Sequence, residues 1–165
     1  FQGRVIPNAP DVLAVGALVA HKGHRYLADT AEMMPELRFA VAGTGTLCYP
    51  SLEHLGYRED VPDLLRSAKV FVHPSVEEGM GQVLVEAMLA KIPVVATSVG
   101  GIPEVVGEHG VLVRPRSPVD LANAIRDVLR GVHPDLETAH HYARKRFSVA
   151  EMVEKTVQVY RSVLR

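Results

Sequence analysis

The chain has 165 residues, of which 47% are hydrophobic and 22% are charged, which is ordinary for one globular domain with a buried core. Its 18 Lys and Arg residues against 19 Asp and Glu residues leave no basic excess that would favour nucleic acid as a partner. No stretch has the ~18 uninterrupted apolar residues of a membrane span, and one cysteine, Cys48, allows neither an internal disulfide nor a cysteine-based metal site.

The first ten residues are typical of the end of a linker, since Pro7 follows a short apolar pair. The chain begins at Phe1 rather than at Met, so we expect a fragment of a longer protein. Residues 1–10 are interpreted as a linker remnant and residues 11–165 as one domain. A single cysteine fits a reducing compartment, and the N-terminus lacks the layout of a secretion signal, so we expect a cytoplasmic protein.

Apolar runs of strand length alternate along the chain with segments of helical spacing, as they do in a parallel sheet that helices cover on both faces. The expected strands are 11–19, 37–42, 52–57, 69–73, 93–97 and 110–113. The expected helices are 26–35, 61–67, 81–91, 102–106, 117–129, 134–147 and 148–164. The pattern predicts a Rossmann-like α/β fold, a doubly wound parallel sheet of about six strands in this order along the chain. The two closing helices are expected to pack outside it.

The stretch from Pro74 to Glu104 is expected to form a loop, a helix, a strand and a second loop. Gly79 and Gly81 bracket a turn that exposes backbone N–H groups where the helix begins, and this end of a helix favours an anion such as phosphate. Glu86 lies among apolar neighbours in the helix, which predicts a buried carboxylate that needs ligand hydroxyls as partners. The alternative is a solvated helix face, because Gln82 and Glu86 stand four residues apart.

Lys22 lies in the loop after the first expected strand, at the edge where a doubly wound fold binds its ligand. A lysine there offers a point charge for a phosphate, and the alternative is a solvated loop lysine. Gly100 and Gly101 allow a close approach of the backbone to a ligand, and the alternative is an ordinary turn.

Histidines near this edge give no metal-site signal. His21, His24 and His73 lie near loop ends, and without a second cysteine or a paired helical spacing each is interpreted as an ordinary surface or core residue. Ser75 has two glutamates close by in sequence but no ordered Ser-His-Asp spacing. We therefore expect neither a metal centre nor hydrolase chemistry.

Glu78 and Glu86 form a Glu-x7-Glu pattern within Pro-Ser-x-x-Glu-Gly-x-Gly, and the segments Pro-Val-Val-Ala-Thr and Gly-Gly-Ile-Pro-Glu follow. This combination resembles the C-terminal, nucleotide-sugar-binding half of the retaining GT-B glycosyltransferases of family 4, the glycosyl transferases of group 1. The resemblance extends to Lys22 upstream and to the helix of Tyr160 downstream, so it covers nearly the whole chain.

The resemblance implies a donor-binding domain of a retaining hexosyltransferase, which moves a sugar from a nucleotide diphosphate sugar to a glycan, lipid or small-molecule acceptor. Glu78 would contact the sugar hydroxyls, and Lys22 would neutralise charge on the leaving diphosphate, so both would be catalytic. Glu86 would bind the ribose. The implied substrate-binding residues are Gly79, Met80, Gly81, Glu86, Gly100 and Gly101. The resemblance implies no cofactor and no required metal.

The same resemblance assigns the acceptor, and any peripheral membrane association, to a missing N-terminal domain. The isolated domain is therefore expected to be inactive in transfer. The last helix would return toward that domain, which would leave uncovered an apolar surface at Met152, Val153, Val157 and Tyr160.

Two departures from the family pattern keep a second hypothesis open. Ala17 stands where the family usually has an arginine that shares the diphosphate with the lysine, and the segment after Gly45 lacks most of the usual helix. A regulatory or binding module that kept the fold and lost turnover would fit both. A sugar epimerase of the same architecture is a third possibility, but it is not expected to have the Glu-x7-Glu context.

Overall fold

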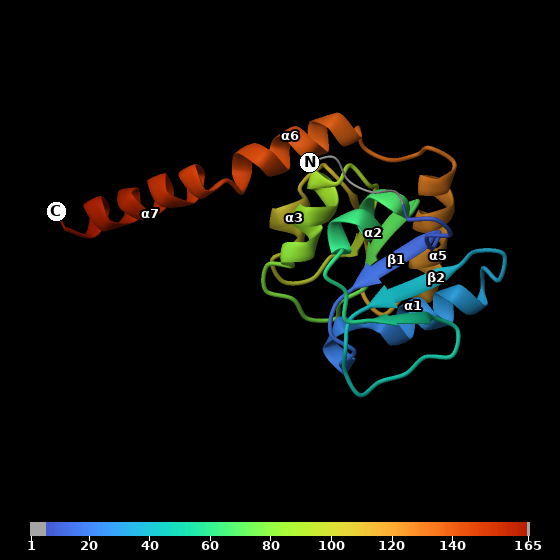
Figure 1. Ribbon diagram of the computed structural model, residues 1–165. Coiled ribbons are helices and arrows are strands. Elements are labelled where there is room, and N and C mark those ends of the chain that lie inside the picture. The colour runs from blue at the N-terminus through green and yellow to red at the C-terminus, as the bar shows by residue number, and fades with distance from the viewer. Residues whose placement is uncertain (1–5, 165) are drawn as a thin grey trace.

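A computed structural model describes residues 6–164 of the chain. The part of the expected linker remnant in residues 1–5 lies outside the described residues, as does Arg165. Figure 1 shows one α/β body from which the last helix projects. The expected fold class is confirmed.

A six-stranded sheet, with every neighbouring pair parallel, forms the centre of this body. All six expected strands are present, and each is shorter than its expected range. They are β1 (Val12–Val15), β2 (Phe39–Ala42), β3 (Glu53–Gly56), β4 (Val70–His73), β5 (Val94–Thr97) and β6 (Val111–Val113). Within the sheet their order is β3-β2-β1-β4-β5-β6, so the winding reverses between β1 and β4. A reversal of this kind opens a crevice at the carboxyl ends of the two strands.

Helices cover both faces of the sheet. They are the 3-10 helix η1 (Ala20–Lys22) and the α-helices α1 (His24–Glu32), α2 (Val61–Ser67), α3 (Gln82–Leu89), α4 (Ile102–Val106), α5 (Pro118–Leu129), α6 (Leu136–Arg146) and α7 (Val149–Val163). Helices α1 and α5 share one apolar core, whereas α2, α3, α4 and α6 share the other. Between β2 and β3 there is no helix, in line with the short segment noted after Gly45.

Local chemistry explains where several elements begin. Ser117 accepts a hydrogen bond from the backbone N–H of Asp120, and Pro118 follows it at the first helical position, so α5 begins at a favoured cap. Asp135 and Ser148 cap α6 and α7 in the same way. The strands that adjoin the crevice are apolar on both faces, which fixes their place at the centre of the sheet.

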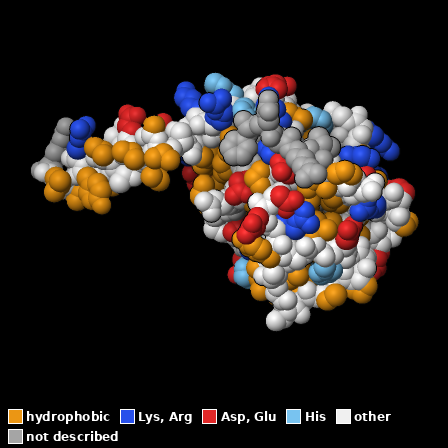
Figure 2. All heavy atoms as spheres, viewed as in Figure 1, with side chains coloured by type: hydrophobic (Ala, Val, Ile, Leu, Met, Phe, Trp, Pro, Cys, Tyr) orange, Lys and Arg blue, Asp and Glu red, His pale blue; other side chains and the backbone are white. Residues whose placement is uncertain are grey.

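The expectation that both closing helices pack outside the sheet is correct for α6 and wrong for α7. Helix α6 lies against α3, but no residue of α7 is buried, and the helix extends away from the body (Figure 1). Met152, Val153, Val157 and Tyr160 are all exposed, and Figure 2 shows an apolar stripe along this helix. The stripe has the spacing of a core-facing helix, but no other described residue covers it.

None of the helices within residues 6–164 combines the length and apolar character that crossing a bilayer needs.

Candidate functional site

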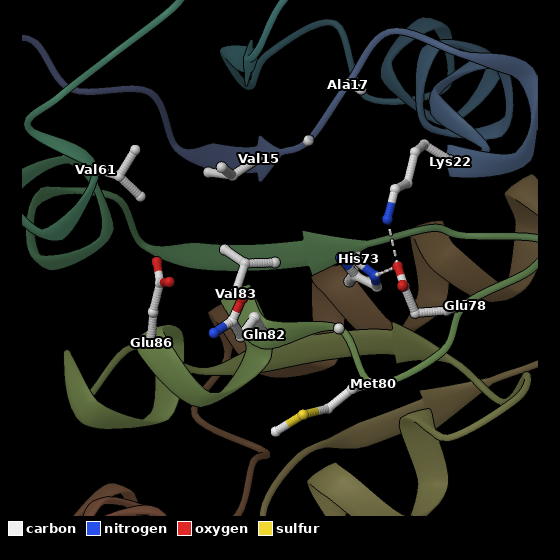
Figure 3. Close-up of a pocket in the computed structure, with 12 residues that line it drawn as sticks. Val15, Ala17, Lys22, Val61, His73, Glu78, Met80, Gln82, Val83 and Glu86 are labelled. Atoms are coloured by element: carbon white, nitrogen blue, oxygen red, sulfur yellow. Dashed lines mark hydrogen bonds and ion pairs between the residues drawn. The ribbon is translucent and has the colours of Figure 1, made fainter. Parts of the chain in front are cut away.

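A cavity of about 510 Å³ opens at the carboxyl edge of the sheet, where the strand order reverses (Figure 3). Its walls come from the ends of β1 and β4, the segment between β1 and η1, the end of η1, the start of α2, the loop before α3 and the first two turns of α3. The lining residues are Val15, Gly16, Ala17, Lys22, Val61, His73, Glu78, Met80, Gly81, Gln82, Val83 and Glu86. The structure therefore brings together Lys22, Glu78, Met80, Gly81 and Glu86 among the residues expected from the sequence.

Backbone contacts fix Lys22 opposite the loop that follows β4. The carbonyl oxygen of His21 accepts hydrogen bonds from the N–H groups of Val76 at 2.8 Å and Glu77 at 3.3 Å. Gly23 has φ +69°, and a Cβ atom there would lie 1.9 Å from the carbonyl oxygen of Pro74. Only glycine allows both this backbone conformation and this approach. The two loops are thereby held side by side.

Glu78 is the centre of a polar cluster at one end of the cavity. Lys22 Nζ lies 2.6 Å from Glu78 Oε2, and His73 Nε2 lies 2.9 Å from the same oxygen (Figure 3). The backbone N–H of Gly79 donates to Glu78 Oε1 at 3.2 Å. Burial by itself raises the pKa of Glu78, but the hydrogen bonds from Lys22 and His73 outweigh it and lower the pKa to about 2. The carboxylate is therefore ionised at neutral pH.

His73 is the site residue that the sequence interpretation missed. It is buried at the end of β4, and burial lowers its pKa although the contact with Glu78 acts in the opposite direction. A neutral imidazole then donates its Nε2–H to Glu78. The position of a histidine as the last residue of a buried strand, at the ligand edge of the sheet, was the available signal.

Ser75 joins this cluster without forming a catalytic triad. Its Oγ lies 3.1 Å from His73 Nε2 and 3.3 Å from Glu78 Oε2, and the residue is fully buried. In a triad the serine and the carboxylate contact opposite ring nitrogens, whereas here both contact Nε2. The cluster orients Glu78 and leaves no activated serine.

The first turn of α3 provides the second polar wall. Gly81, with φ +68°, is its N-cap and gives no side-chain hydrogen bond to the turn, while Gln82 and Val83 line the cavity. Backbone N–H groups at a helix start that no side chain caps favour an anion. The expected phosphate-binding turn is thus in place beside Lys22.

Glu86 corrects one premise of the sequence interpretation. It is exposed rather than buried, on the same solvent-facing side of α3 as Gln82. That side nevertheless lines the cavity, and Figure 3 shows Glu86 beside Val61, at the end away from Glu78. Partial desolvation raises its pKa. Helical spacing correctly placed Glu86 at the ligand site but did not predict its exposure to solvent. Glu86 is exposed because the cavity leaves one side of α3 open.

Gly79, Gly100 and Gly101 do not line the cavity and instead hold the loop that bears Glu78. The N–H of Gly101 donates to the carbonyl oxygen of Gly79 at 3.0 Å. A Cβ atom on Gly100 would lie 1.9 Å from the carbonyl oxygen of Glu78, and one on Gly101 would lie 2.1 Å from that of Gly79. Because glycine has no side chain, Gly100 and Gly101 let the loop after β5 pack directly against the loop that bears Glu78.

The charges of the cavity are one lysine and two glutamates, and Ala17 presents only a methyl group at its wall. Among residues 6–164 no group of three or more His, Cys, Asp or Glu side chains is arranged to hold a metal. The expectation that no metal or cofactor is required stays a prediction.

Comparisons with known proteins agree on one family. A family model described as glycosyl transferases group 1 matches residues 9–131. The chain is 32% identical over 194 residues to alpha-maltose-1-phosphate synthase of Mycobacterium tuberculosis, which covers 96% of this chain and 49% of that protein. It is 38% identical over 151 residues to D-inositol 3-phosphate glycosyltransferase of Geodermatophilus obscurus, which covers 78% of this chain and 32% of that protein.

Solved structures show the same relationship. The structure of Anabaena Alr3699/HepE in complex with UDP matches with a TM-score of 0.81 and 27% identity, over 93% of this chain and 49% of that one. The complex of the same protein with UDP-glucose matches with a TM-score of 0.80. The chain spans about a third to a half of the length of these relatives.

Proposed function

The chain belongs to the group 1 glycosyltransferases, and from this premise we propose that it is the donor-binding domain of a retaining glycosyltransferase. The proposed donor is a nucleotide diphosphate sugar. One observation supports this most strongly: Lys22, paired with Glu78, and the uncapped start of α3 face the same cavity at the carboxyl edge of the sheet.

The shape of the cavity fits an elongated donor. The Lys22 and Glu78 cluster and the Glu86 carboxylate lie at opposite ends of it, as Figure 3 shows. We place the diphosphate between Lys22 and the first N–H groups of α3, the ribose hydroxyls at Glu86, and the sugar toward Glu78. The two Anabaena Alr3699/HepE structures are complexes with UDP and with UDP-glucose, so UDP is the first nucleotide to test.

In the proposed reaction the bond between the anomeric carbon and the diphosphate oxygen breaks, and its electron pair leaves with the diphosphate. An acceptor hydroxyl then forms the new bond on the same face of the sugar, and its proton passes to the departing diphosphate oxygen. Lys22 stabilises the charge that grows on the leaving oxygen, an interaction that is stronger in the transition state than in the ground state. Glu78 is ionised, with a pKa of about 2, so it accepts hydrogen bonds from sugar hydroxyls and does not act as a proton donor.

We further propose that the acceptor site belongs to a separate N-terminal domain. The chain covers only about half of its longer relatives, and the apolar stripe of α7 is uncovered among the described residues. In a two-domain transferase, closure of the cleft aligns donor with acceptor and excludes water. The domain alone should therefore bind the donor without transferring its sugar.

A thermal-shift screen tests this proposal. The chain is titrated with UDP, GDP and ADP and with their sugars, and at least one nucleotide should raise the melting temperature, because a ligand that binds only the folded state stabilises it. If none does, the proposed donor site is wrong. Incubation of the chain with the matched donor and an acceptor should give no glycosylated product, and turnover comparable with that of the full-length protein would place the whole chemistry in this domain.

Ala17 supports a second candidate, a nucleotide-sugar-binding module with little or no turnover. The methyl group at this position leaves Lys22 as the one Lys or Arg side chain that lines the described cavity. An assay of the full-length protein for donor hydrolysis or sugar transfer separates the two. Donor binding without either activity would favour the module.

A further inference from the structure

A second cavity, also of about 510 Å³, lies on the other side of the wall that bears Lys22 and Glu78. Arg25 and Tyr26 of α1 contribute to it, together with Tyr49 from the segment after β2 and Arg116 from the segment after β6. Because the segments after β2, β4 and β6 all begin at the carboxyl ends of parallel strands, this cavity opens at the same edge of the sheet as the first.

Neighbouring residues divide between the two cavities. Lys22 and Glu78 line the first, whereas His21 and Glu77, one position earlier in each segment, line the second. The hydrogen bond from the Val76 N–H to the His21 carbonyl oxygen joins the two segments. The cavities therefore share one wall, and a ligand in each would approach the other across it.

Two arginines make the second cavity suited to an anion. Arg25 and Arg116 are both exposed, and neither forms an ion pair with a carboxylate among residues 6–164. Arg116 also has φ +59°, a left-handed conformation that is unfavourable for a long side chain. Such strain persists only where the surroundings maintain it, and it occurs often at ligand sites. Guanidinium groups without partners are good donors to the oxygens of a phosphate.

Tyrosines and a carboxylate supply the remaining surface. Tyr26 and Tyr49 are half-buried and, like Leu47, pack against the core, and in the described part of the chain neither hydroxyl forms a hydrogen bond. Aromatic rings of this kind offer an apolar face together with a polar tip. Glu77 is exposed and can accept hydrogen bonds from hydroxyl groups. An isolated inorganic anion would use the arginines but not these groups.

We propose that the second cavity binds a saccharide that carries a phosphate group, with the phosphate at Arg25 and Arg116 and the sugar ring against the tyrosines. This saccharide is distinct from the donor and from the acceptor, which we assign to the N-terminal domain. This assignment goes beyond the proposed function, because the shared wall separates the second cavity from the donor cavity. The binding site itself is defined by the residues of the cavity.

Calorimetric titration of this chain with glucose 6-phosphate tests the proposal, with glucose and inorganic phosphate as separate probes. Glucose 6-phosphate should bind more tightly than either probe. Arg25→Ala and Arg116→Gly should each weaken its binding by about tenfold or more, and UDP binding should be unchanged. The glycine variant also removes the unfavourable conformation at position 116 and so keeps the fold. Arg161→Ala, an exposed change on the projecting α7, is the control of equal charge and should have no effect.

The outcomes separate this proposal from the donor assignment. UDP binding without glucose 6-phosphate binding would overturn the second site and leave the first intact. Glucose 6-phosphate binding without binding of any nucleotide would support the site and contradict the donor assignment. Displacement of glucose 6-phosphate by UDP, equal affinity for inorganic phosphate, or an equal loss in Arg161→Ala would each overturn the proposal.

Discussion

Lys22 Nζ lies 2.6 Å from Glu78 Oε2, so the cation proposed for the diphosphate and the carboxylate proposed for the sugar form an ion pair with each other. Both side chains are largely shielded from solvent, at 23% and 11% exposure. A diphosphate that enters the cavity must therefore share Lys22 with Glu78. The loop contacts of His21 and Gly23 hold the lysine in reach of both.

Replacement of the lysine should weaken nucleotide binding. A hydrogen bond to a charged group is worth roughly 1.5–3 kcal/mol, so Lys22→Ala should lower UDP affinity by roughly tenfold to a hundredfold in calorimetry. Lys145→Ala removes an exposed lysine of α6 and is the matched control. Equal UDP affinities in the wild type and in Lys22→Ala would show that Lys22 does not contribute to nucleotide binding.

Removal of the negative charge at Glu78 should separate the nucleotide from the sugar. Glu78→Gln frees Lys22 from its ion pair, so UDP should bind at least as tightly as before, whereas the additional affinity for UDP-glucose over UDP should fall. Calorimetry with both ligands measures this difference. An unchanged preference for UDP-glucose would show that Glu78 does not contact the sugar.

Replacement of Glu86 should lower the affinity only for a ligand that has ribose hydroxyls. Glu86→Ala should weaken UDP binding by about tenfold, the effect of one charged hydrogen bond. It should leave unchanged the affinity for a uridine diphosphate analogue that lacks the 2′ and 3′ hydroxyls. Glu154→Ala removes an exposed glutamate of α7, far from the cavity in sequence and absent from its lining, and is the control of equal charge. If both ligands lose affinity equally, Glu86 acts by its charge or by packing.

An added cation at the cavity wall should strengthen binding. Ala17→Arg places a guanidinium beside Lys22 and should raise UDP affinity by up to about tenfold. Ala20→Arg adds the same charge to the same segment but at the second cavity, and should have a smaller effect on UDP. Equal gains in both variants would indicate a general effect of net charge.

Gly23→Ala tests the loop contact that positions Lys22. The left-handed conformation alone costs an alanine roughly 1–2 kcal/mol. Gly56→Ala measures that cost, since Gly56 has φ +67° and open space around its Cβ position. Gly23→Ala should lower the free energy of unfolding by more than Gly56→Ala, because its Cβ would lie 1.9 Å from Pro74 O. Urea unfolding of both variants gives the comparison, and equal losses would contradict the contact.

His24 should make the protein less stable as the pH falls. Burial lowers its pKa from 6.5 to about 4, although its hydrogen bond with the Ala17 carbonyl oxygen raises it. Between these values the unfolded chain binds the proton and the folded chain does not, so the free energy of unfolding decreases with falling pH. Glu78 adds a second loss from its ordinary value of 4.5 down to about 2. Urea unfolding across the first window should show a smaller pH dependence in His24→Gln, and identical slopes would exclude His24 as the cause.

Sequence patterns predicted the strands well because a sheet buried on both faces demands continuous apolar runs, as in the strands that end at Val15 and His73. The turn at Gly81 was predictable for a similar local reason, the glycines that open α3. The position of helix α7 was not predictable in this way, because the spacing of its apolar residues predicts a buried stripe but does not say what covers it. That the stripe is exposed agrees with the expectation drawn from the family resemblance.

Contacts across the sequence account for what was missed at the site. The role of His73 depends on Glu78 folding back over the end of β4, and the exposure of Glu86 depends on an open space between α2 and α3. Neither the contact of His73 with Glu78 nor the open space beside Glu86 can be read from the spacing of residues along one element. Gly100 and Gly101 were expected near the ligand, but in the structure they pack against the backbone of Glu78 and Gly79. This contact also joins segments that are distant in the sequence.

The most direct test of the donor site is a map of backbone amide shifts in the NMR spectrum of this chain during titration with UDP. We expect the largest changes at Gly81, Gln82 and Val83, whose N–H groups would receive the diphosphate, with further changes around Lys22 and Glu86. Small changes there, with large ones around Arg25 and Arg116 or along α7, would contradict the proposed donor site.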